Sequence, residues 1–424
     1  TIMEENNRRV SAPSTDAVLP PPIVRATPAT DRAQPTLADF WKGAARFQTD
    51  VPDTGLPMGE SDTIVVANLT GNGHTLWSYV HASHPALGVV DQCGAPVEFP
   101  GCLVIFTSAD GGRTFTPTGG TPTGDAPTCQ IPCRACPCTS TRDHIDQQQY
   151  PRVQRYIHPD ASATGELAPA TWLMVYEYRA NLLLRRSADG WNWSAAEEIP
   201  LTGIWQNWLM RCPAHAAVGP HPFAQPTYDC LVGSPPGLVI DAHPSSVTSP
   251  NATPNPTSQQ TPEVYVFMGL GQNPSAMGCY RGPLHAPATL YRQCDQHPLF
   301  VGSPTYGPTD GTGPVANPYF DFRTISSADV IQIGDEYYML YEGVRGPSAG
   351  AAGDTQFTLG LARTTKGRID GPWETYSANP ILVDMPGNVG VGHADLLVLD
   401  GTTYVYTSLD GVIRSRLRLA WHTD

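Results

Sequence analysis

The sequence is poor in lysine, in long apolar runs and in basic stretches. Of its 25 lysine and arginine residues only Lys42 and Lys366 are lysines, and the formal net charge is −14. An acidic chain without a basic stripe is a poor match for nucleic acid, so we expect no nucleic-acid partner. No run of about 18 apolar residues occurs, and a membrane-spanning helix is therefore not expected.

Long helices are not expected either, because 43 proline and 40 glycine residues are spread over 424 positions. These residues interrupt helices and favour turns. Hydrophobic residues make up 40% of the chain, which is ample for a core. Closed all-β architectures often run long as a single unit, and the length fits one of them.

A repeated hairpin organises the chain. Residues 326–345 alternate between apolar and polar on both sides of a Gly334-Asp335 turn, as a β-hairpin does. Aromatic-rich strands of the same rhythm occur at five places, namely 75–83, 172–179, 263–271, 338–345 and 402–411. Repeated units that cannot bury their faces alone stack into arrays or close into propellers. The sequence therefore predicts an all-β protein, a five-bladed β-propeller, with six blades as the alternative.

The predicted propeller spans residues 36–424 and follows an arm. Its blades are expected at about 60–118, 149–200, 205–300, 320–383 and 390–424. Residues 1–35 are rich in proline, which is typical of an extended arm that could tether or dock. A capping-box pattern at residues 36–39 predicts a short helix through Phe47. The chain begins at Thr1 without methionine, as we expect after removal of an export signal.

Two turns begin with Ser-Ala-Asp-Gly. Residues 108–115 match the Asp-box of propeller blades, and residues 187–194 are a looser copy. In such a turn the aspartate caps its own hairpin and the aromatic residue packs between strands. The pattern favours a propeller and indicates no chemistry.

The cysteines predict disulfides and export. All ten lie between Cys93 and Cys294, and an even number favours a disulfide framework in a secreted or cell-surface protein. Local pairs are expected between Cys93 and Cys102, Cys212 and Cys230, and Cys279 and Cys294. The other four cysteines have the spacing of a zinc knuckle, so a zinc site is an alternative at Cys129, Cys133, Cys136 and Cys138. In an exported chain disulfides are favoured over zinc. The complete pairing stays open.

Motifs in the last blades resemble a known family. They are GPWE at 371–374, NPIL at 379–382 and GVGHADLLVLDG at 390–401. These resemble the five-bladed furanosidase superfamily of arabinanases, β-xylosidases and invertase-like enzymes. Two earlier stretches, 60–66 and 239–269, are similar to its first-blade and third-blade strands. The resemblance is strongest over residues 320–424 and implies glycoside hydrolysis by a pair of carboxyl groups.

The resemblance also implies roles for single residues. Asp62 would be the general base, Asp241 a second carboxylate that orients and tunes, and His393 an axial histidine. A hard cation such as Ca²⁺ near His393 is possible, and a metal site remains otherwise unknown. Asp395, Arg323 and Trp77 are further binding candidates, with Trp77 either stacking on a sugar or packing in the core.

The general acid departs from the family pattern. It would fall near Ser327, where only Asp329 lies close. Glu342 and Glu177 are possible substitutes on second strands, or they form structural pairs with the arginines that follow them. Asp329 and Asp395 could likewise pair with arginine or bind a cation. The sequence therefore leaves open whether the chain is an enzyme.

Two functions follow from these observations. The first is an exported glycoside hydrolase-like propeller that acts on or binds extracellular polysaccharide, with a glycan as its partner. The alternative is a non-catalytic structural subunit of an extracellular assembly or filament, or an adhesin, that self-associates through residues 1–35. Sugar, linkage and oligomeric state cannot be inferred from the sequence.

Overall fold

We describe the fold from a computed structural model. The residues that it describes are 33–57, 61–66, 75–82, 87–91, 93–97, 101–118, 127–131, 148–157, 170–178, 181–201, 235–242, 261–270, 275–303, 320–321, 324–344, 357–382, 392–408 and 414–422. The arm predicted at residues 1–35 lies outside them except for its last three positions. Among the described residues, no helix has the length and apolar character to cross a membrane.

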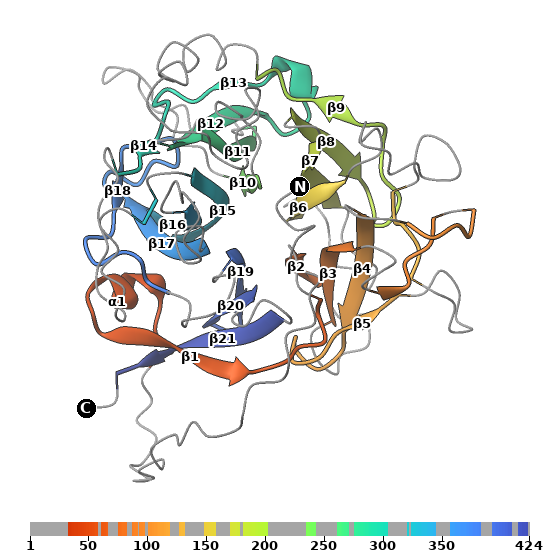
Figure 1. Ribbon diagram of the computed structural model, residues 1–424. Coiled ribbons are helices and arrows are strands. Elements are labelled where there is room, and N and C mark those ends of the chain that lie inside the picture. The colour runs from red at the N-terminus through yellow and green to blue at the C-terminus, as the bar shows by residue number, and fades with distance from the viewer. Residues whose placement is uncertain are drawn as a thin grey trace, which may run out of the picture.

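Five antiparallel sheets stand in a ring and form a five-bladed β-propeller, as the sequence predicts (Figure 1). Blade 1 consists of β2 (Ser61–Val66), β3 (Thr75–Ala82), β4 (Cys102–Ser108) and β5 (Thr116–Pro117). Blade 2 consists of β6 (Gln149–Ile157), β7 (Ala170–Tyr178), β8 (Asn181–Ser187) and β9 (Glu197–Glu198). Blade 3 consists of β10 (Gly237–Asp241), β11 (Glu263–Leu270), β12 (Ala276–Pro283), β13 (Arg292–Gln293) and β14 (Phe300–Val301).

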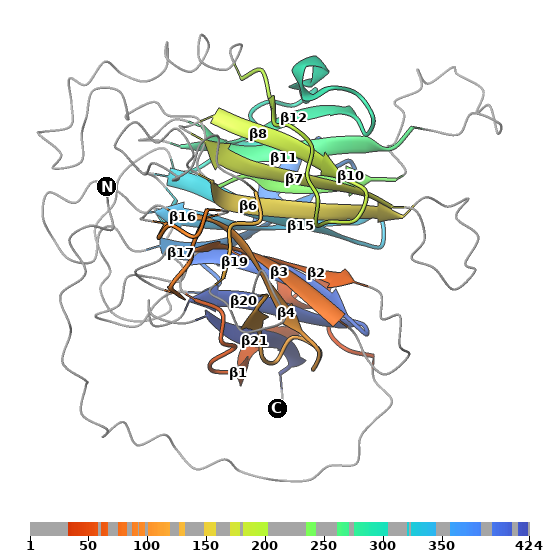
Figure 2. The ribbon, with the colours of Figure 1, turned by 90° about the vertical axis from the view of Figure 1, so that its right-hand side faces the viewer.

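Blade 4 consists of β15 (Thr324–Ile333), β16 (Glu336–Val344), β17 (Phe357–Thr364) and β18 (Trp373–Thr375). Blade 5 consists of β19 (Gly392–Leu399), β20 (Thr402–Ser408), β21 (Arg414–Trp421) and β1 (Ala45–Val51). The described helices are α1 (Leu37–Trp41) and the single 3₁₀ turn η1 (Ala288–Leu290). The first strands β2, β6, β10, β15 and β19 lie nearest the axis (Figure 1), and Figure 2 shows the stacked blades from the side.

The five aromatic-rich strands of the sequence are the second strands of the five blades, β3, β7, β11, β16 and β20. Each pairs with both of its neighbours and is buried on both faces. Apolar and aromatic side chains are favoured in such strands. The repeat read from the sequence is therefore the repeat of the blades.

The ring closes through a strand from the beginning of the chain. Strand β1 pairs with β21, so blade 5 combines the two ends of the propeller. Arg416 of β21 ties this closure by donating from Nε to Asp50 at 2.8 Å. The predicted helix is confirmed at its start, but its predicted end at Phe47 is wrong. Helix α1 stops at Trp41, and Gly43, with a φ of 74°, turns the chain into β1.

The core is divided among the interfaces between blades. Five buried clusters occur, one between each pair of neighbouring blades. The cluster of blades 4 and 5 also buries Leu37 of α1, and that of blades 5 and 1 joins Leu399 to Leu76. Because each blade contributes to two clusters, the ring is held by apolar contacts along its whole circumference.

Two disulfides lie within the described residues. Cys279 is bonded to Cys294, as predicted, whereas Cys102 is bonded to Cys129 and not to Cys93. Cys102 begins β4, and the bond ties it to a segment that returns past the same blade. Cys93 is also disulfide-bonded. Because Cys129 is in a disulfide, it is not available to the alternative zinc site. The remaining predicted partners lie outside the described residues, namely Cys133, Cys136, Cys138, Cys212 and Cys230.

Candidate functional site

Three axial strands share a bulge that points one polar side chain to the axis. Register shifts interrupt β6, β15 and β19 near their beginnings. In each bulge one residue has a left-handed backbone, with φ of 56° at Tyr150, 50° at Ser327 and 54° at His393. Such a φ is uncommon outside glycine and is maintained here by the bulge. Two positions further on are the side chains that meet at the axis, Arg152, Asp329 and Asp395.

Three aspartates form an axial carboxylate cluster, made of Asp62 in β2, Asp329 in β15 and Asp395 in β19. One oxygen of each lies within 4.8 Å of one oxygen of the others. Their exposed fractions are only 5%, 6% and 0%. Two of the three predicted catalytic aspartates therefore meet, together with a predicted binding residue, but they meet in the interior.

Arg152 fills the axis beside this cluster and is 2% exposed. Its guanidinium reaches Asp62 of blade 1 at 3.7 Å. It also donates to the Pro236 carbonyl before β10 at 3.2 Å and to the Ser327 hydroxyl of blade 4 at 3.0 Å. A fourth contact is the Ala394 carbonyl of blade 5 at 2.8 Å. One side chain of blade 2 thus contacts every other blade.

The carboxylates of the cluster also bond across blade boundaries. Asp62 accepts the backbone N–H of Val153, and Asp329 accepts that of Leu396 at 2.6 Å. Among the described residues, neither oxygen of Asp395 has a partner of good hydrogen-bond geometry, although Thr63 lies beside it and favours its charged form. Two of the three aspartates are thereby used to join neighbouring blades.

Burial makes these carboxyl groups weak acids. Burial raises the pKa of Asp62 well above its ordinary value, although Arg152 opposes this shift. Burial raises the pKa of Asp329 to about 7 against the same arginine. Burial also raises the pKa of Asp395, with Arg414 and Arg152 opposing. At neutral pH the cluster therefore favours retaining protons over carrying three full charges.

The predicted Glu342 and His393 form a second pair next to the cluster. Oε1 of Glu342 lies 3.3 Å from Nδ1 of His393 and accepts the His393 backbone N–H at 3.1 Å. Its other oxygen accepts the Ser326 hydroxyl at 2.8 Å. The His393 ring lies 5.5 Å from that of Tyr150. Glu342 is only 1% exposed, so it too links two blades from a buried position.

A hard cation could be held by the axial carboxylate cluster. Carboxylate oxygens are the ligands that Ca²⁺ and Mg²⁺ prefer, and the cluster offers one from each aspartate. His393 is not part of this group. Arg152 and Arg414 already bring positive charge to the same space, since both favour the charged form of Asp395. The donor set fits a cation, but it is already partly neutralised by arginine.

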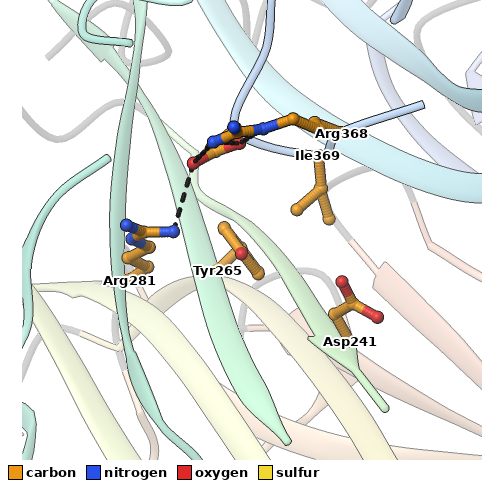
Figure 3. Close-up of a pocket in the computed structure, with 6 residues that line it drawn as sticks. Asp241, Tyr265, Arg281, Arg368 and Ile369 are labelled. Atoms are coloured by element: carbon orange, nitrogen blue, oxygen red, sulfur yellow. Dashed lines mark hydrogen bonds and ion pairs between the residues drawn. The ribbon is translucent and has the colours of Figure 1, made fainter. Parts of the chain in front are cut away.

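Asp241 and Trp77 lie away from this cluster. Asp241 ends β10, opposite the first residue of β11, and lines a pocket between blades 3 and 4 with Tyr265, Arg281 and Arg368 (Figure 3). That pocket has a volume of about 10 Å³, room for a single water molecule. Trp77 lies between blades 1 and 2, 5.9 Å from the ring of Trp172. Arg323 lies outside the described residues.

Sequence reasoning missed Arg152. The signal was available in a short repeat, because Tyr150-Pro151-Arg152, Ser327-Ala328-Asp329 and His393-Ala394-Asp395 occupy equivalent bulges. Aligning these tripeptides places an arginine where two other blades have aspartates. Opposite charges at equivalent axial positions indicate a salt-bridged centre.

The comparisons with known proteins give a likeness of fold. No protein-family model matches the sequence. No curated protein matches it either. Among solved structures, an endo-arabinase from Bacteroides thetaiotaomicron is 12% identical with a TM-score of 0.46 and covers 89% of this chain and 98% of its own. An exo-1,5-α-L-arabinanase from a bovine ruminal metagenomic library is 12% identical with a TM-score of 0.43, covering 88% and 95%.

A third structure comes from a family of mannoside phosphorylases that contains glycoside hydrolases acting on β-1,2-mannosidic linkages in Candida mannan. It is 12% identical with a TM-score of 0.47 and covers 90% of this chain and 97% of its own. Arabinanases are thus among the similar structures, as the sequence motifs predicted.

Proposed function

We propose that this protein works outside the cell as a non-hydrolytic propeller, a structural subunit of an extracellular, polysaccharide-containing assembly. The observation that carries the proposal is the position of Arg152, which occupies the axis and contacts all four other blades. In this view the axial charges stabilise the ring and do not act on a substrate.

The requirements of glycoside hydrolysis differ from the arrangement at this axis, which supports a non-hydrolytic role. It requires an acid and a base that face a sugar, with carboxyl groups roughly 5–10 Å apart around the scissile bond. Here the carboxyl groups of Asp62 and Asp329 are 5% and 6% exposed and are bonded to the backbone of the next blade. A sugar could reach them only after Arg152 had left the axis and the blades had separated.

Export is proposed from the disulfides. The bonds Cys102–Cys129 and Cys279–Cys294 close loops within blades 1 and 3. Such bonds persist in oxidising compartments and are rare in the cytosol. Self-association through residues 1–35 remains part of the proposal. The described chain begins at the rim of blade 5, where the Trp421 indole donates to the Ala33 carbonyl at 3.0 Å.

A hydrolase is the second candidate, and one observation favours it. Asp329 has a pKa of about 7, as a general acid requires at neutral pH, and it lies within 4.8 Å of a second carboxylate oxygen. In that case Asp329 would protonate the leaving oxygen and Asp62 would activate water.

The two candidates are separated by activity and by size. The intact protein is incubated with arabinan, arabinoxylan, levan and pectin, and the release of reducing ends is followed. We expect no release above that of an Asp62→Asn/Asp329→Asn double variant. Sedimentation of the intact chain should show an assembly that deletion of residues 1–35 dissociates. Turnover that disappears in the double variant, from a protein that sediments as a monomer, would overturn the proposal in favour of the hydrolase.

A further inference from the structure

Arg155, near the end of β6, is a cation without a counter-ion. It makes no hydrogen bond or ion pair with a residue of the described chain, and its Nε is buried without a partner. The side chain is only half-buried. Its pKa is lowered by burial, with no carboxylate acting against the shift. A guanidinium normally recruits carboxylates or carbonyls, so an external acceptor would complete its coordination.

An aromatic platform extends away from this guanidinium in a row, made of Trp172, Trp77 and Trp191. The Arg155 guanidinium carbon lies 5.3 Å from the ring centre of Trp172, its cross-strand partner. Trp77 stacks on Trp172 at 5.9 Å with an interplanar angle of 24°. Trp191 meets Trp77 edge-on at 5.8 Å and is 38% exposed. The platform therefore ends in one exposed indole, and at Trp172 it contacts a cation that has no partner among the described residues.

The turn that carries Trp191 is held in place from several sides. Asp189 accepts the backbone N–H groups of Trp191 and Asn192, both at 2.8 Å. The Gly190 carbonyl accepts the Tyr79 hydroxyl at 2.6 Å, and the Trp191 carbonyl accepts the Gln130 side-chain amide at 2.8 Å. The hydrogen bonds that Asp189 accepts from Asn192, Trp191 and Ser187 outweigh its burial and lower its pKa to about 2. The Asp189 carboxylate thus serves the turn, and the indole is preorganised for a ligand.

A second arginine that stacks on a tryptophan has carboxylate partners within the chain. Arg363 lies over Trp41 at 4.5 Å, close to the arrangement of Arg155 and Trp172. Unlike Arg155, it pairs with Glu374 at 2.7 Å and with Glu336 at 3.6 Å. Among the described residues, the same stacking motif thus occurs once with two carboxylates and once with none. The difference suggests that a carboxylate comes from outside at Arg155.

We propose that Arg155 and the aromatic platform form a subsite for a carboxylated sugar, a hexuronate residue of an acidic polysaccharide. The guanidinium would pair with a uronate carboxylate, while the exposed indole of Trp191, at the other end of the tryptophan row, would cover the apolar C–H face of another sugar ring of the same polysaccharide chain. The subsite is not the axial site. Arg155 lies five residues beyond Tyr150 along β6, about 16 Å in an extended strand. The proposal therefore stands whether or not the axis hydrolyses glycans.

The acidic charge of the whole chain does not exclude an anionic ligand. The formal net charge is −14, but charges further away than about 8 Å are largely screened at physiological ionic strength. The Asp189 carboxylate beside the platform is held by its own turn, and no described carboxylate pairs with Arg155. Local charge complementarity therefore favours the uronate.

The test is the binding of a tetragalacturonate to the intact protein, measured by titration calorimetry and by the tryptophan fluorescence. The matched ligand is the same tetrasaccharide with its carboxylates methyl-esterified. Arg155→Gln should weaken binding of the acidic form about tenfold, as loss of a charged hydrogen-bonded pair does. Trp191→Ala should weaken it about three- to tenfold. Arg363→Gln is the matched control, because it removes the same charge from a stacked arginine and should leave binding unchanged.

Each outcome decides the proposal. Preference for the acidic ligand that disappears in Arg155→Gln and persists in Arg363→Gln supports it. Equal binding of the acidic and esterified forms, an equal effect of both arginine substitutions, or no binding of tetragalacturonate, of an oligoguluronate or of an oligoglucuronate would overturn it. The melting temperature of each variant is measured alongside. If Arg155→Gln does not fold, Arg155→Lys, which retains the charge but not the planar fork, should show an intermediate loss, and unchanged affinity in that variant would also overturn it.

Discussion

Several arginines link neighbouring blades in this propeller, and two of them differ in burial, Arg152 at the axis and Arg281 at the rim. Arg152 at the axis is 2% exposed, lies 3.7 Å from the carboxylate of Asp62 and also favours the charged forms of Asp329 and Asp395. Arg281 at the rim has a side chain 13% exposed and contacts three carboxylates. These are Glu263 at 3.6 Å, Asp295 at 2.8 Å and Asp370 at 3.1 Å.

The difference teaches how burial changes the role of a charge. At the rim, Arg281 pairs with Asp370, whose side chain is 3% exposed, and with Asp295, whose side chain is 55% exposed, and an ion pair in contact with water contributes little to stability. At the axis Arg152 is 2% exposed, so solvent does not compensate for a lost partner and the guanidinium is satisfied by groups from the other four blades. The contacts of the axial arginine therefore depend on all five blades being in place, whereas those of the rim arginine depend only on the contact between blades 3 and 4.

Removing the axial arginine is expected to have the largest effect. Arg152→Met leaves Asp62 without its cation and the carbonyls of Pro236 and Ala394 without donors. Breaking a buried ion pair in this way costs about 3–5 kcal/mol of unfolding free energy. Urea denaturation at neutral pH measures it. The double variant Arg152→Met/Asp62→Asn should recover part of the loss, since it also removes the unpaired charge, and a single-variant loss below about 1 kcal/mol would contradict the role of Arg152 as a hub.

The axial carboxylates should also give stability an unusual pH dependence. The pKa of Asp329 is about 7 in the folded protein against an ordinary 3.8, so the folded state binds a proton more tightly than the unfolded state. The unfolding free energy should therefore fall as the pH rises from about 4 to about 7, by at most roughly 1.4 kcal/mol per unit for this group. Denaturation midpoints across this range measure the slope.

The difference between the wild-type and Asp329→Asn profiles isolates this contribution. His297, whose pKa is lowered by burial, acts in the opposite direction in the same range, but it is common to both proteins. Asp110→Asn is the control, because the pKa of Asp110 is lowered to about 2 and its contribution is lost only as the pH falls below about 4. If the unfolding free energy of the wild type and of Asp329→Asn changed with pH by the same slope, the pKa of Asp329 would not be raised in the folded protein.

The axis and the rim were not equally predictable from the sequence. Local alternation identified the second strand of every blade and therefore the number of blades, because each such strand is buried along its length. The closing strand β1 was missed, since its partner β21 lies more than 350 residues away and no local pattern encodes that pairing. The tripeptides at the axis were visible, but not the bulges that aim Arg152 and Asp395 at one point. Asp241 was predicted to lie with the axial carboxylates as a residue near the start of an inner strand. It lies instead at the end of β10, and the sequence alone does not show where such a short strand begins and ends.

Removing the rim arginine should have the smallest effect and would sharpen the comparison most directly. Arg281→Gln removes three ion pairs, yet Asp370 retains Arg368 at 3.0 Å and Asp295 has a side chain 55% exposed. The loss should therefore be below about 1 kcal/mol in low salt and should shrink further as salt screens the remaining charges. Urea denaturation at low and high sodium chloride, run beside Arg152→Met, measures the loss of unfolding free energy and its dependence on salt. The axial loss should persist at high salt, because buried pairs are screened much less. A rim loss as large as the axial one would mean that the number of carboxylates, and not burial, sets the importance of an arginine in this ring.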